Sequence, residues 1–124
     1  MRGSGAILFV AALLAAVAGC APEYQQTPVA LRGVWTTEAP GYEGRYLTIE
    51  PSTVVFGVRG VQTARQVVRH VREGSAPGGR AFDLTCVGPQ GLEIGVHLVL
   101  DGANGNELHL RHRPKVIWTR KEAP

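Results

Sequence analysis

The segment LEIGVHLVL, residues 92–100, decides the fold class of this chain. An apolar side chain stands at every second position, while Glu93, Gly95, His97 and Val99 occupy the positions between. A period of two sustained over nine residues is typical of a β-strand with one buried face. The segment therefore predicts a strand whose buried face carries Leu92, Ile94, Val96, Leu98 and Leu100.

The segments on either side repeat this alternation. Phe82, Leu84 and Cys86 alternate with polar residues before it, and Leu108 and Leu110 alternate after it. Clusters of turn-forming residues separate such runs from Arg32 onward, and connections this short require antiparallel pairing. Eight short strands are expected, at about residues 33–37, 46–50, 53–58, 65–72, 82–86, 92–100, 107–111 and 116–120.

An antiparallel sheet of eight short strands tends to close on itself, because closure removes its unpaired edges. We therefore predict an all-β fold, a small antiparallel up-and-down barrel or flattened barrel, after an N-terminal signal helix. Its interior is expected to be filled by side chains or to leave a shallow end pocket.

Residues 61–73 are ambiguous. Val61, Ala64, Val68 and Val71 also satisfy a helical spacing, so a helix is the alternative there. The β-branched pair Val67-Val68 favours a strand.

The first twenty residues form a separate unit. A short positive end at Met1 and Arg2 is followed by an apolar run over residues 6–17 and then by Val17-Ala18-Gly19-Cys20. This arrangement is typical of a secretion signal, and the run is shorter than the about 20 apolar residues of a membrane span.

Small residues directly before Cys20 resemble the lipobox of bacterial lipoproteins. The resemblance implies cleavage after residue 19, acylation of Cys20 and membrane lipid as a partner. In that family's sorting pattern, Ala21 in place of an aspartate implies the outer membrane, facing the periplasm. We therefore expect a signal peptide over 1–19, a lipidated flexible tether over 20–30 and the barrel over 31–124.

The composition excludes several function classes. Loss of Arg2 with the leader leaves twelve basic against ten acidic residues, and this small excess of positive charge is not that of a nucleic-acid-binding protein.

With Cys20 acylated, Cys86 has no disulfide partner in the chain and is expected to be a small buried residue. His97 and His109 lie side by side in one register but are too few for zinc. We expect no enzyme, no metal and no cofactor; a nucleophilic Cys86 is the enzyme alternative.

Gly33-Val34-Trp35 opens the first barrel strand, and Trp118-Thr119-Arg120 closes the last. This pair of motifs resembles the calycin and lipocalin pattern. The resemblance implies that Trp35 plugs one barrel end and that Arg120 lies across its ring. If a ligand or partner site exists, we expect it at the barrel mouth, near Tyr42, Tyr46 and Trp118.

The function expected from these features is that of a membrane-anchored, periplasm-facing lipoprotein, a non-catalytic module that binds an envelope protein or another partner. The alternative is a miniature lipocalin-like carrier of one small apolar ligand. The tether would raise the effective concentration of the domain near membrane partners.

Overall fold

The computed structural model describes residues 23–102 and 105–122. Its strands are β1 (Glu23–Tyr24), β2 (Gly33–Thr37), β3 (Arg45–Ile49), β4 (Thr53–Val58), β5 (Val61–Ala76), β6 (Gly79–Val87), β7 (Glu93–Asp101), β8 (Glu107–Leu110) and β9 (Trp118–Glu122). A single turn of 3₁₀ helix, η1 (Val29–Leu31), precedes β2. The predicted signal helix lies outside the described residues.

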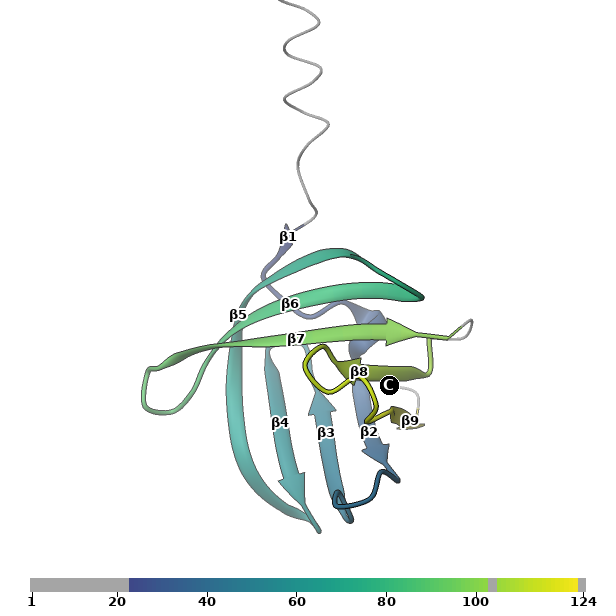
Figure 1. Cartoon of the computed structure of the whole chain (residues 1–124). Helices are drawn as coiled ribbons and strands as arrows, with labels where there is room; N and C mark the ends of the chain where they lie inside the picture. The colour runs from purple at the N-terminus through teal and green to yellow at the C-terminus, as the bar shows by residue number, and fades with distance from the viewer. Residues whose placement is uncertain (1–22, 103–104, 123–124) are drawn as a thin grey trace, which may run out of the picture.

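Strands β2 to β9 form a closed antiparallel barrel (Figure 1). Each strand pairs with the next one along the chain, and β9 pairs with β2 to complete the ring. The all-β fold and the up-and-down barrel of eight strands are therefore confirmed. Strand β1 is an additional edge strand, paired with β5 through Glu23–Arg72 and Tyr24–Val71.

The ambiguous segment is a strand, as predicted, but a longer one. Strand β5 pairs with β4 through residues 61–67 and with β6 through residues 67–76, so it belongs to both halves of the barrel. Figure 1 shows it rising beside β4 and then bending over alongside β6. A register shift between Val68 and His70 accompanies the bend, because a bulge adds one residue and increases the local twist.

The interior is filled by side chains. The core residues are each at most 6% exposed and include Phe82, Leu84, Cys86, Leu98 and Leu108. Burial of such side chains contributes about 1.5–3 kcal/mol each relative to exposure. Because one continuous core and a closed sheet lie within residues 27–122, this part of the chain has what an independently folding domain requires.

The buried face predicted for residues 92–100 is wrong at its start. Val96, Leu98 and Leu100 are buried, but Leu92 is 68% and Ile94 39% exposed. Strand β8 pairs with β7 only from Leu98 onward, so among the described residues no strand pairs with the first half of β7 on that side. The β6–β7 hairpin projects past the barrel at this point (Figure 1).

One end of the barrel is closed by Trp35, Arg120 and η1. The indole of Trp35 is fully buried and donates to the carbonyl of Leu31 at 2.9 Å. The guanidinium of Arg120 lies 4.4 Å from the centre of the Trp35 ring and donates to the carbonyls of Ala30 and Arg32. Gly33 takes a φ of 131°, which favours glycine, where the chain turns from η1 into β2. We refer to this end as the plugged end.

The tether predicted for residues 20–30 differs from the structure from residue 23 onward. Besides the pairing of β1, Thr27 is 1% exposed and donates through its hydroxyl to the carbonyl of Glu50 at 2.7 Å. Arg32 donates to the carbonyl of Thr27 at 2.7 Å. The composition of the segment suggested a linker, but its polar groups are used to fasten it across the β3–β4 turn.

Arg120→Met should lower the free energy of unfolding by about 2–4 kcal/mol, because it removes the cation–π contact and leaves covered carbonyls without donors. Urea denaturation of residues 21–124 checks this. Arg69→Met is the matched control, since Arg69 is exposed and its replacement should cost no more than about 0.5 kcal/mol. Equal losses in the two variants would show that Arg120 does not hold the plugged end together.

Candidate functional site

The end opposite the plugged end carries a pocket of about 280 Å³, which we call the mouth pocket. It is formed by the β2–β3 and β8–β9 connections, the starts of β3, β5 and β9, and the ends of β4 and β8. Tyr42, Tyr46 and Trp118, the three residues predicted from the sequence, all line it. The other lining residues are Arg45, Phe56, Gly57, Val58, Thr63, Leu110, His112 and Arg113.

Tyr42 and Trp118 form the aromatic part of the mouth pocket. Their rings meet edge to face, with centroids 6.3 Å apart and planes at 87°. The guanidinium of Arg45 lies over the ring of Tyr42, 4.8 Å from its centre. Such contacts hold an aromatic surface and a positive charge next to each other.

Trp118 is also a core residue, only 3% exposed. Its indole N–H has no hydrogen-bond acceptor among the described residues. Truncation to Ala would open a cavity and cost about 3–5 kcal/mol, so Tyr42 is the better position for probing binding. Tyr42 is half-buried and lies on a connection rather than in a strand.

Tyr46 has a structural role in addition to its place at the pocket. It is paired with Gly57 across β3 and β4, and its ring covers the glycine so closely that a Cβ there would lie 2.1 Å from the ring. The side chain of Tyr46 is therefore held against the sheet. It is less free than Tyr42 to follow a ligand.

Sequence reasoning missed the cationic residues of the mouth pocket. Arg45, His112 and Arg113 come from segments 67 or more positions apart, and nothing local marks them. The up-and-down topology supplies a usable signal, because the β2–β3 and β8–β9 connections must lie at the same end of such a barrel. Basic residues in those two connections could have been grouped on that ground.

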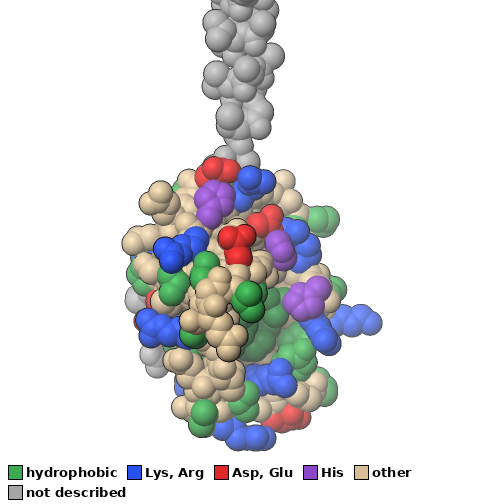
Figure 2. Space-filling model, turned by 90° about the vertical axis from the view of Figure 1, so that its left-hand side faces the viewer, with side chains coloured by type: hydrophobic (Ala, Val, Ile, Leu, Met, Phe, Trp, Pro, Cys, Tyr) green, Lys and Arg blue, Asp and Glu red, His purple; other side chains and the backbone are tan. Residues whose placement is uncertain are grey.

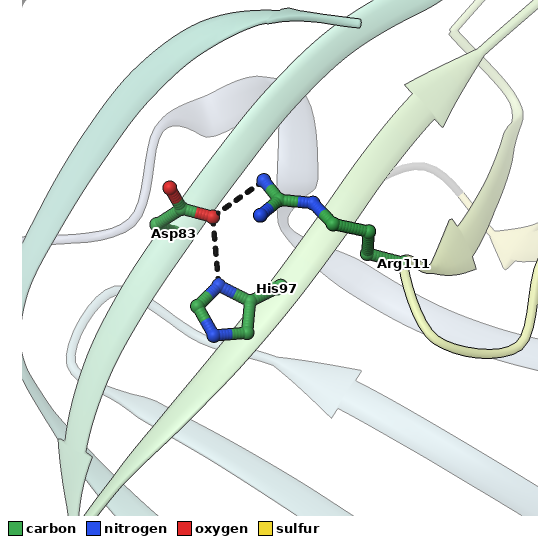
Figure 3. A network of polar contacts seen from close by, with 3 residues as sticks. All are labelled: Asp83, His97 and Arg111. Atoms are coloured by element: carbon green, nitrogen blue, oxygen red, sulfur yellow. Dashed lines mark hydrogen bonds and ion pairs between the residues drawn. The ribbon is translucent and has the colours of Figure 1, made fainter.

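Three of the four histidines, His70, His97 and His109, lie beside a carboxylate. Oδ1 of Asp83, on β6, lies 2.7 Å from both Nδ1 of His97 and Nη2 of Arg111. Figure 3 shows how the three side chains face one another. His109 does not stand beside His97, because the register pairs His109 with Val99. Its Nδ1 lies 2.9 Å from Asp101 without hydrogen-bond geometry. On the face in Figure 2, the histidines and most of the acidic side chains lie in the upper half, whereas basic side chains are spread over the whole face.

These polar clusters offer no metal centre in the described part of the chain, where no three His, Cys, Asp or Glu side chains come together. Asp83 accepts from both partners at exposed positions, and exposed ion pairs contribute about 0–1 kcal/mol each. We regard them as surface pairs that align β6, β7 and the β8–β9 connection.

Cys86 is fully buried among Phe82, Leu84 and other core residues, on the face predicted for it. Burial raises the pKa of its thiol to about 11. At neutral pH the thiol is therefore protonated, and the thiolate that acts as a nucleophile is scarce. This environment suits a small core residue rather than a catalytic one.

Comparisons with known proteins return nothing: no protein-family model, curated protein or solved structure matches the chain. Cys20, the predicted lipidation site, lies outside the described residues. Among residues 23–102 and 105–122, no helix is long and apolar enough to cross a bilayer.

Cys86 should react with Ellman's reagent at pH 8 roughly a hundredfold more slowly in the folded domain of residues 21–124 than in the unfolded chain. The reason is its raised pKa together with its burial. Absorbance of the released thiol measures the rate, and Cys86→Ala gives the background. Equal rates before and after denaturation would revive the catalytic alternative.

Proposed function

We propose that this chain is a lipid-anchored, periplasm-facing lipoprotein whose barrel is a non-catalytic binding module, with its site in the mouth pocket. The observation that carries the proposal is the pocket itself: aromatic and cationic side chains gather there on a barrel whose interior is otherwise filled. The burial of Cys86 supports a non-catalytic role. A miniature lipocalin-like carrier, the alternative function, would also have to hold its small apolar ligand in this pocket.

The fold determines which end of the barrel an anchor at Cys20 would hold near the membrane. Strand β1 begins at Glu23, three positions after Cys20, and three residues span at most about 11 Å when extended. Acylation of Cys20 would thus hold the end of the barrel near β1 close to the membrane surface. Figure 1 shows β1 at the top and the β2–β3 and β4–β5 connections at the bottom, so the mouth pocket would face the periplasm.

The anchor is tested by Cys20→Ala in the full chain. The natural chain should take up an alkyne-labelled fatty acid and sediment with outer membranes, because two or more acyl chains make release negligible. Cys20→Ala should lose the label and the membrane association, whereas Cys86→Ala, the matched cysteine control, should keep both. Label retained by Cys20→Ala would contradict the anchor.

The site is tested with N-phenyl-1-naphthylamine, a neutral aromatic probe, on the purified domain of residues 21–124. Probe fluorescence should rise on binding, and the indole N–H resonance of Trp118 should shift. Tyr42→Ala should weaken binding at least about tenfold, since one aromatic contact contributes about 0.5–1.5 kcal/mol beyond its buried area.

Tyr24→Ala is the matched control for the probe experiment. Tyr24 is 41% exposed and lies on β1, away from the mouth pocket. Its replacement should leave probe affinity unchanged. If the probe does not bind, or binds equally to the Tyr42→Ala variant, the mouth pocket is not the binding site.

A further inference from the structure

The mouth pocket is lined by basic side chains and by no acidic ones. Arg45, His112 and Arg113 line it, and no Asp or Glu is among the lining residues. The ion pairs of the described residues use other basic side chains, and none of them involves Arg45 or Arg113. Two guanidinium groups therefore border this pocket without a carboxylate partner.

Glu43 is the acidic residue nearest to Arg45 in the sequence, and its carboxylate is engaged within its own loop. Glu43 accepts from the backbone N–H of Gly41 at 3.3 Å, inside its own loop. Backbone hydrogen bonds of this kind lower the pKa of Glu43 and keep its carboxylate occupied. It does not line the pocket and leaves the charge of Arg45 and Arg113 available to a ligand.

Apolar surface lies directly beside these cations. Arg45 lies over the ring of Tyr42, and the rings of Tyr42 and Trp118 meet edge to face. The other apolar lining residues are Phe56, Val58 and Leu110. Cations and aromatic rings thus lie within one small concavity.

We propose that the mouth pocket selects a soluble amphiphilic anion: a compact apolar or aromatic group packed against Tyr42 and Phe56, joined to a carboxylate, sulfonate or phosphate held by Arg45 and Arg113. This inference rests on the proposed function of the same pocket and adds the class of ligand. Guanidinium groups bind such oxyanions through charge-assisted, often paired hydrogen bonds. A volume of about 280 Å³ suits one small molecule.

The occupant is a free molecule rather than a lipid headgroup of the anchoring membrane. The chain enters at β1, on the plugged-end side of the barrel, and the mouth pocket lies at the other end (Figure 1). A barrel held by Cys20 would therefore turn the two arginines away from the bilayer.

The experiment compares two fluorescent probes of nearly the same skeleton on residues 21–124. One is 8-anilinonaphthalene-1-sulfonate, which carries a sulfonate, and the other is the neutral N-phenyl-1-naphthylamine. The Arg45→Gln/Arg113→Gln variant should bind the sulfonate about tenfold or more weakly than the natural domain, because it lacks the charge-assisted hydrogen bonds of the two guanidinium groups. Affinity for the neutral probe should change less than about twofold.

Arg65→Gln/Arg69→Gln is the charge-matched control. Both arginines are exposed on β5 and neither lines the mouth pocket, so this variant should bind both probes like the natural domain. Equal loss of sulfonate binding in the two double variants would mean that net charge, not the pocket, attracts the anion, and would overturn the inference.

The remaining outcomes separate the inference from the proposed function. Neutral-probe binding that depends on Tyr42, with no effect of Arg45→Gln/Arg113→Gln on the sulfonate, overturns the anion preference and leaves the site standing. If neither probe binds to the natural domain, both the anion preference and the proposed function of the mouth pocket are overturned. Flotation of the domain with phosphatidylglycerol vesicles, lost in Arg45→Gln/Arg113→Gln, would identify a lipid headgroup and overturn the soluble ligand.

Discussion

The contact of Arg120 with Trp35 is the constraint on which the rest of the structure depends. The guanidinium covers the indole and donates to backbone carbonyls of the segment that leads into β2, so one side chain joins the last strand, the first strand and the plug. Burial lowers the pKa of Arg120, yet a guanidinium stays charged at any physiological pH. The contacts of Arg120 at the plugged end therefore keep their charge at any physiological pH.

The fold could be predicted because alternation and turn residues identify strands without knowledge of their neighbours. The ambiguity of residues 61–73 has a physical origin in the bulge of β5. Val68 and Val71 are both buried although three positions separate them, because the bulge inserts one residue between them. An inserted residue turns a period of two into a spacing that resembles a helix. The exposure of Ile94 could not be foreseen either, since it depends on how far β8 extends along β7.

The site could be predicted only in part. Aromatic residues near the ends of strands indicated Tyr42, Tyr46 and Trp118, and the structure brings these three together. Their different roles depend on register and depth, which local sequence does not encode: Tyr46 covers Gly57, and Trp118 extends into the core. Arg45, at the start of β3, and Arg113, in the β8–β9 connection, line the same pocket only because these two distant parts of the chain lie at one end of the barrel.

The topology also has a consequence for the order in which the barrel assembles. Seven of the eight barrel pairings join strands that follow one another in the chain, so hairpins form with little loss of loop entropy. The seam between β2 and β9 is the exception, and its contacts reach across 88 positions. Distant pairings of this kind slow folding. The ring closes late, and the side chain that seals it, Arg120, lies on the last of the barrel strands to be synthesised.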